Sequence, residues 1–239
     1  MKTRTIKLTV EYDGTDFNGW QIQPGGCRTV QGEIERALEI ILKKPTRVHG
    51  SGRTDSGVHA LGQTAHLKTS SVISCDVLCR ALNANLSADI VIRDVCEAAA
   101  DFHAQFSAVR KRYRYTILNR QTPCAINRRF CTHIPYRLNA AAMRKAAGFF
   151  IGCHDFKSLA ASDPARQRKG IEQNTVRTVF VSELKKTRDY LVYEVVADGF
   201  LYKMVRNIAG TLIGVGCGQI RADDIPDILS GKDRDVIGP

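Results

Sequence analysis

The sequence predicts an α+β protein of two similar domains, each a mainly antiparallel sheet with helices on one face, with a basic cleft between the domains. Three observations predict this class. The chain has 239 residues, enough for two small domains. Its first half has a β-α-β-β-α-β order, which is typical of antiparallel sheets covered on one side. Its second half repeats that rhythm, so we expect domains at residues 1–105 and 106–239.

The first half begins with a strand at residues 5–12, where apolar and polar side chains alternate. A loop with the only tryptophan, Trp20, follows, and we interpret it as a turn anchored by an aromatic plug. Residues 29–44 then place apolar side chains at helical spacing behind Thr29, a residue suited to an N-cap. Beyond them we expect extended segments at Val48 and at residues 58–67. A helix at residues 75–86 and a strand at residues 90–96 follow.

The second half is predicted to run strand, helix, strand, strand, helix, at residues 109–118, 139–150, 176–184, 190–197 and 200–215. Between the first helix and the second strand lies a loop, residues 158–171, that contains Pro164. This loop carries three cations, Arg166, Arg168 and Lys169. Their charge suits a phosphate backbone.

Charge and composition narrow the class of partner. Lys and Arg number 35 against 24 Asp and Glu, a net charge of +11, which favours a polyanion. The eight cysteines include no Cys-x-x-Cys pair, so we expect reduced thiols and no zinc site. The longest apolar run, residues 208–218, is shorter than the ~20 residues of a membrane span, and the N-terminus has no signal-peptide pattern. We therefore expect a cytoplasmic protein that binds neither metal nor membrane.

Residues 49–63 place four glycines around Arg53 and Asp55. Glycines let the backbone turn sharply and approach a ligand, so this spacing predicts Asp55 on a tight, exposed bend. Two interpretations stay open: Asp55 is a reacting carboxylate, or it closes an Asx-turn beside a surface arginine. The chain has no P-loop and no complete Gly-x-Gly-x-x-Gly motif, which leaves a nucleotide cofactor unsupported.

The run RKRYRYTIL alternates cations and aromatic rings. In an extended strand, Tyr113 and Tyr115 share one face, and the opposite face carries Arg110, Arg112 and Arg114. Rings that stack on bases and guanidinium groups that bind phosphate together fit RNA. The alternative is that the tyrosines belong to the core and the arginines to a solvated face.

A helix over residues 200–215 would stack Tyr202, Arg206, Gly210 and Gly214 at intervals of four. Small residues beside Arg206 allow close packing, so its guanidinium is expected to be desolvated and to need an anion. A structural ion pair is the competing interpretation.

Taken together, these motifs resemble the TruA-type family of tRNA pseudouridine synthases. The resemblance covers about nine-tenths of the chain in order, through YDGTDFNGWQIQP, GRTDSGVHALGQ, FHAQFSAVRKRYRYTILN and GFLYKMVRNIAGTLIGVG. It implies an enzyme that converts uridine to pseudouridine in the anticodon stem-loop, at tRNA positions 38, 39 and 40, without metal or organic cofactor. It also implies a homodimer, with the tRNA lying across both subunits.

The resemblance further implies a role for each motif. Asp55 is the catalytic carboxylate, and Arg53 beside it helps to hold the flipped nucleotide. Tyr113 stacks on the target uracil, and Arg206 pairs with Asp55. Ser56 departs from the family pattern, which more often has alanine there, and the chain ends where relatives continue into a further apolar segment.

Two rival functions use the same residues. A non-catalytic RNA-binding protein would keep Asp55 only as a turn residue, and a hydrolase would use this carboxylate to cleave the glycosidic bond. The combination of Asp55 with Arg206 favours the isomerase over a binding protein, because binding alone does not need that pair.

Overall fold

A computed structural model gives the fold of residues 3–162 and 174–231. The chain divides into two compact units, Met1–Ala108 and Val109–Pro239. The predicted phosphate-binding cations Arg166, Arg168 and Lys169 lie outside the described residues, so their role stays a prediction.

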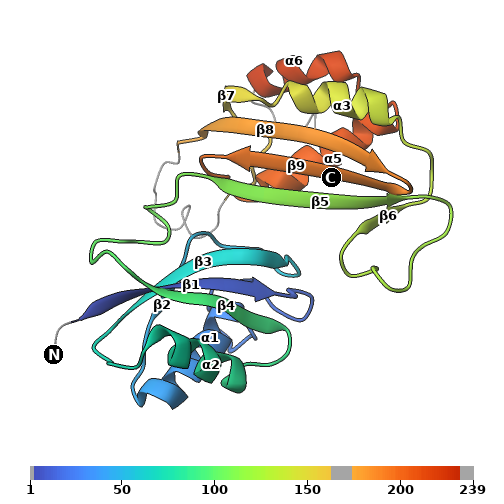
Figure 1. The fold of residues 1–239 in the computed structure, drawn as a ribbon. Helices are drawn as coiled ribbons and strands as arrows, with labels where there is room; N and C mark the ends of the chain where they lie inside the picture. The colour runs from blue at the N-terminus through green and yellow to red at the C-terminus, as the bar shows by residue number, and fades with distance from the viewer. Residues whose placement is uncertain (1–2, 163–173, 232–239) are drawn as a thin grey trace. The chain divides into compact units, whose positions relative to one another are not determined.

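The first unit has the predicted β-α-β-β-α-β order (Figure 1). Its elements are β1 (Arg4–Tyr12), α1 (Val30–Leu42), β2 (Val48–Gly50), β3 (Ala60–Thr69), α2 (Cys75–Asn85) and β4 (Ile90–Ala98). The strands form one sheet in the order β2-β3-β1-β4, and each neighbouring pair is antiparallel.

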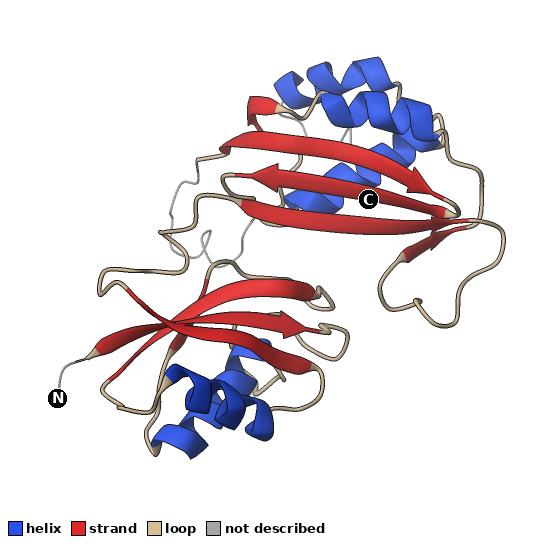
Figure 2. Ribbon diagram, viewed as in Figure 1, coloured by secondary structure: helices blue, strands red, loops and turns tan. Residues whose placement is uncertain are grey.

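Both helices of this unit cover the same face of its sheet (Figure 2). Ile6, Leu8 and Val10 alternate along β1 and are fully buried against the apolar sides of α1 and α2. Thr29 caps α1 as predicted, since its side chain accepts a hydrogen bond from the backbone N–H of Gly32. The predicted sheet with helices on one face is therefore confirmed for the first unit.

The opposite face of the same sheet carries a group of histidines. His49 of β2 and His66 of β3 are paired across the strands, with ring centroids 5.1 Å apart. The segment after β4 packs against them: the ring of His103 lies 4.6 Å from that of His66, and Ala104 donates its backbone N–H to His66 Nδ1 at 3.2 Å. We call His49, His66 and His103 the histidine cluster.

The second unit forms a mixed sheet in the order β6-β5-β9-β8-β7, in which only the β5–β6 pair is parallel. Its described elements are β5 (Lys111–Asn119), β6 (Thr132–Ile134), α3 (Ala140–Gly148), β7 (Gly152–Asp155), β8 (Val176–Thr187), β9 (Tyr190–Ala197), α5 (Met204–Gly216), the 3₁₀ turn η1 (Ala222–Asp224) and α6 (Ile225–Gly231).

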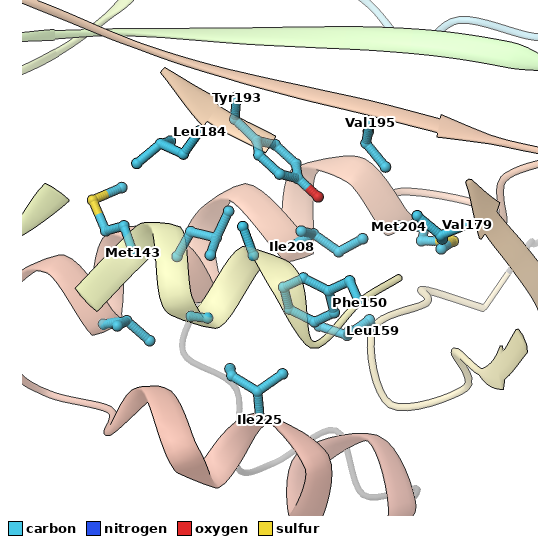
Figure 3. Close-up of a cluster of buried hydrophobic side chains, with 14 of the residues drawn as sticks. Met143, Phe150, Leu159, Val179, Leu184, Tyr193, Val195, Met204, Ile208 and Ile225 are labelled. Carbon is cyan, nitrogen blue, oxygen red and sulfur yellow. The ribbon is translucent and has the colours of Figure 1, made fainter. Parts of the chain in front are cut away.

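A separate apolar core holds the second unit together (Figure 3). Leu184 and Tyr193 extend from the strands toward Met143 and Ile208 on the helices. Tyr193 is buried, and its hydroxyl group is hydrogen-bonded to Ser182 Oγ at 2.8 Å, so the core contains a satisfied polar group.

Several predicted boundaries differ from the structure by a few residues, and two of these differences have a clear local reason. The strand predicted from residue 58 begins at Ala60, because the backbone N–H of Val58 donates to Asp55 O in a turn. The helix predicted from residue 200 begins at Met204, because Lys203 has a left-handed φ of 58° that interrupts any earlier helix. The short elements β6, β7 and α6 were not predicted.

Candidate active site

The loop of residues 51–59, between β2 and β3, carries Asp55 and is held by the N-terminal loop that follows β1. Trp20 lies at the centre of this arrangement and is 1% exposed. Its ring packs directly on Gly50, where an added Cβ would lie 2.6 Å from the indole ring. Trp20 is thus the predicted aromatic plug, and it supports the base of the Asp55 loop.

Several hydrogen bonds join the Asp55 loop to Tyr12, at the end of β1, and to the loop that follows it. The backbone N–H of Trp20 donates to Thr54 O at 3.1 Å, and that of Gly57 donates to Phe17 O at 3.3 Å. Ser56 Oγ donates to Phe17 O at 3.2 Å. The hydroxyl groups of Tyr12 and Thr54 are 2.8 Å apart. The residues on both sides of Asp55 are therefore fixed in place.

Two glycines of the N-terminal loop permit this close approach. A Cβ on Gly14 would lie 2.0 Å from Val58 O, and a Cβ on Gly19 would lie 2.4 Å from Thr54 O. Gly19 also has a φ of +82°, which side chains rarely adopt. Only glycine fits at either position without displacing the Asp55 loop.

Asp55 itself starts a tight turn, as predicted. Its backbone oxygen accepts a hydrogen bond from Val58 N–H at 3.2 Å, and Gly57 has a φ of 78°. Its side chain is half-buried and forms no hydrogen bond or ion pair with the described residues of its own unit. The turn is therefore closed by the backbone of Asp55, and the carboxylate does not close an Asx-turn.

Two neighbours complete this group of residues. Arg53 is exposed and forms no ion pair within the described part of the first unit. His59 Nδ1 lies 3.0 Å from both Asp13 Oδ1 and the backbone N of Gly14, so it joins the end of the Asp55 loop to the N-terminal loop. His59 was not predicted, because nothing in the sequence links it to Asp13.

The second group of candidate residues lies on β5 of the other unit. Tyr113 and Tyr115 face the core side of the sheet and are partly buried. The ring of Tyr113 meets that of Phe200 edge to face, with centroids 5.0 Å apart. The Tyr115 hydroxyl group is 2.8 Å from Thr132 Oγ1, which indicates a structural role for Tyr115.

Arg112 and Arg114 are exposed on the opposite face of β5, as the alternation predicts. Both guanidinium groups lie near Glu194, at 3.7 and 3.6 Å from its carboxylate oxygens. Arg110 precedes β5, which begins two residues later than the predicted strand, and its guanidinium lies over the exposed ring of Phe180, 4.6 Å from the centroid. One carboxylate thus partly neutralises two of the three predicted phosphate-binding arginines.

Arg206 lies in the first turn of α5. The predicted stack of Tyr202, Arg206, Gly210 and Gly214 is wrong at its first member, because Tyr202 precedes the helix. The predicted desolvation is also wrong: Arg206 is exposed, and in the described part of its unit it forms no ion pair. Water can therefore solvate this guanidinium, and the described part of its unit leaves it accessible to an anion.

Comparison with known proteins identifies relatives of this chain. A family profile described as tRNA pseudouridine synthase matches residues 8–107 and 146–239. Three proteins named tRNA pseudouridine synthase A are similar to this chain. The one from Thermoanaerobacter sp. (strain X514) is 43% identical to it over 235 residues, and the one from Bacillus subtilis (strain 168) is 44% identical over 235 residues. The one from Geobacillus sp. (strain WCH70) is 45% identical over 237 residues. These alignments cover 98–99% of this chain and 92–93% of the relatives.

This chain belongs to the tRNA pseudouridine synthase family. The profile matches both units of this family member and includes the Asp55 loop and α5. Residues 108–145, which contain Tyr113, lie between its two matched ranges. Within the described ranges, this pseudouridine synthase has no cluster of three His, Cys, Asp or Glu side chains that could hold a metal ion. The described helices are also too short or too polar to cross a bilayer.

Proposed function

We propose that this chain converts uridine to pseudouridine in the anticodon stem-loop of tRNA, at tRNA positions 38, 39 and 40, with Asp55 as the catalytic carboxylate. The observation that carries the proposal is the Asp55 loop. It holds an acidic side chain on a turn fixed by backbone hydrogen bonds, with no partner among the described residues of its unit. A half-buried carboxylate that the described residues of its unit leave unpaired on a fixed turn can contact a substrate directly.

The reaction is an isomerisation, so nothing is added or lost. The N1–C1′ glycosidic bond of uridine breaks, the uracil rotates within the pocket, and C5 bonds to C1′. The proton on C5 leaves, and N1 gains a proton. An ionised Asp55 can start this sequence in two ways: it attacks the sugar or the uracil as a nucleophile, or it removes the 2′ proton as a base.

We assign three further residues to this chemistry. Arg206, exposed and without an ion pair in its unit, supplies the cation that keeps Asp55 ionised through a charge-assisted hydrogen bond. Tyr113 stacks on the target uracil and is our candidate for the base that removes the C5 proton. Arg53 helps to hold the flipped nucleotide beside Asp55.

The proposal extends to how tRNA is bound. A uridine in a stem is stacked and paired, so it must be flipped out at a cost of a few kcal/mol. The positive charge of the chain, including Arg110, Arg112, Arg114 and the cations of the 158–171 loop, offsets this cost by binding the RNA backbone. We propose that the protein acts in the cytoplasm as a homodimer, with the tRNA across both subunits.

The test is to map modified uridines in tRNA after incubation with the purified protein, and to measure release of the C5 hydrogen. We expect pseudouridine at positions 38, 39 and 40. Asp55→Asn and Asp55→Ala should lower the release rate by roughly 10²–10⁴-fold or more, since a positioned acid–base or nucleophilic group is lost. The affinity for tRNA, measured by filter binding, should stay within a few-fold.

Asp101→Asn is the matched control, because Asp101 is an exposed carboxylate of the same unit outside the Asp55 loop. It should leave both turnover and binding unchanged. Undiminished turnover by Asp55→Ala would refute the catalytic assignment. Binding without any modified uridine would favour the RNA-binding protein, and free uracil among the products would favour the hydrolase.

A further inference from the structure

Two cysteine thiols face each other in the loop between β5 and β6. The Sγ atoms of Cys124 and Cys131 are 3.6 Å apart, and both residues are partly buried. Elsewhere in the described chain, no two thiols are in such contact. A disulfide needs an S–S distance of about 2.05 Å, so a shift of about 1.5 Å would suffice.

The fold holds these thiols together from both sides. Before Cys124, the Arg120 guanidinium donates to Thr122 O at 2.8 Å and to Pro123 O at 3.2 Å. After Cys131, residues 132–134 form β6 and pair with β5. The two ends of the loop are therefore anchored by contacts that do not involve sulfur, and the thiols stay close in the reduced protein.

Further contacts restrain the segment near Cys131. Its thiol donates to Asn127 O at 3.3 Å, inside the loop. His133, two residues later, lies with Nε2 2.8 Å from Arg120 O, which ties β6 back to the start of the loop. The eight residues from Cys124 to Cys131 contain no helix or strand, so they can absorb the small movement that bonding requires.

We propose that Cys124 and Cys131 form a reversible intramolecular disulfide when the protein meets a disulfide oxidant, such as oxidised glutathione. One cysteine thiolate attacks the oxidant, its S–S bond breaks, and one molecule of reduced thiol leaves. The second cysteine then attacks this mixed disulfide, and the second thiol leaves. In total the two cysteines lose two protons and two electrons, and the oxidant gains them as two molecules of reduced thiol.

The loop chemistry also predicts how the rate depends on pH. Burial, together with the neighbouring Cys124, raises the pKa of Cys131 to about 11. A protonated thiol is a poor nucleophile, so this cysteine reacts slowly at neutral pH and faster as the pH rises. The disulfide closes a covalent ring of residues 124–131, which includes two cations of the loop, Arg128 and Arg129.

Trypsin digestion gives a direct test with the full-length protein. The folded protein is incubated with oxidised glutathione, and its remaining thiols are alkylated. It is then unfolded and digested with trypsin. Cleavage after the arginines separates residues 121–128 from residues 130–137, and only a Cys124–Cys131 bond can keep these peptides joined. A single-chain band on a non-reducing denaturing gel shows that the bond lies within one chain. We expect mass spectrometry to detect the joined pair, which disappears when dithiothreitol is added.

The controls use other cysteines of the same chain. Cys27 and Cys153 are exposed, and we expect them to carry glutathione without forming a protein disulfide. Cys153→Ser should leave the joined peptides unchanged, whereas Cys124→Ser should remove them and leave glutathione on Cys131. Circular dichroism checks that each variant is folded. The proposal is overturned if the wild-type protein carries separate glutathione adducts on Cys124 and Cys131. It is also overturned if both stay reduced after prolonged incubation at alkaline pH while Cys27 reacts.

Discussion

Glycine at positions 14 and 19 determines where the Asp55 carboxylate lies. At each position the neighbouring loop presents a backbone oxygen where a side chain would begin. A backbone atom cannot rotate away as a flexible side chain can, so any larger residue moves the loop itself. The position of Asp55 thus depends on two residues that have no reactive group.

We predict that Gly14→Ala lowers turnover strongly. The added Cβ would lie 2.0 Å from Val58 O and must displace the turn that starts at Asp55. Overpacking of this kind costs about 1–3 kcal/mol of stability, and a misplacement of about 1 Å at a reacting group costs roughly 10²-fold in rate. The measurement is kcat and KM for pseudouridine formation, with stability from urea unfolding.

Gly62→Ala is the control for this substitution. Its Cβ would meet only Thr9 Cγ2 at 3.7 Å, an ordinary contact, so rate and stability should stay near those of the wild type. If Gly14→Ala retained full turnover, the close approach of the two loops would not be what positions Asp55.

For single residues, the sequence predicted the local turn at Asp55 better than the contacts between distant segments. The glycines around Asp55 predicted an exposed turn, and the turn is present. The sequence could not predict that His59 contacts Asp13, because that contact depends on how two distant loops pack. It also failed for Arg206, where small neighbours were interpreted as burial and the side chain is exposed.

Two strands and the segment after β4 together create the histidine cluster. His66 is 2% exposed and accepts a hydrogen bond at Nδ1, so the fold holds its imidazole neutral. Burial, together with the charges of His103, His49 and Lys68, lowers the pKa of His66 to about 4, against a hydrogen bond with the His49 backbone that raises it. Lys7, paired with His66 across β1 and β3, is a further cation on this face.

We predict that acid destabilises the first unit through His66. Its pKa is about 6.5 when unfolded and about 4 when folded, so the unfolded chain binds the proton first as the pH falls. Stability is therefore full above pH 6.5 and decreases between pH 6.5 and 4, by up to about 3 kcal/mol. Urea unfolding followed by Trp20 fluorescence reports this unit, because Trp20 is the only tryptophan and lies in its core.

The variant His66→Gln should have a lower stability at neutral pH but at most half of the wild-type pH dependence. His154→Gln, in the other unit, should retain the wild-type slope. A slope that His66→Gln leaves unchanged would mean that other groups cause the acid sensitivity.

Among the elements, the long ones could be predicted, and of the short ones only β2 could. The apolar spacing of α1 and the alternation along β1 each extend over nine residues or more, which gives a clear period. Strands of three or four residues, such as β6 and β7, are too short to show one. The start of α5 was missed because no glycine or proline marks it, and the interruption comes from the backbone conformation of Lys203.

The excess of positive charge is a property of the whole molecule. A net charge of +11 attracts RNA at a distance and gives an affinity that salt weakens. Several cationic side chains do not contribute fully to this effect, because carboxylates within the fold already pair with them, as with Arg36, Arg47 and Lys185.

We predict that the logarithm of tRNA affinity falls steeply with the logarithm of salt concentration. Each phosphate contact contributes about 0.7–0.9 to the slope. Replacing Arg166, Arg168 and Lys169 by alanine should reduce the slope by about 2. The control removes the same charge by replacing Arg36, Arg47 and Lys185, and it should change the slope much less. Equal effects of the two triple variants would show that net charge alone matters and that the RNA does not follow the 158–171 loop.

The two hydrophobic cores do not share a residue. Every member of one core precedes the peptide bond between Ala108 and Val109, and every member of the other follows it. A gene crossover at that bond, between this chain and a relative, would exchange an intact interior and leave the other untouched. Chimaeras made at this junction would therefore inherit two complete interiors, and the side chains packed within each would all come from one parent.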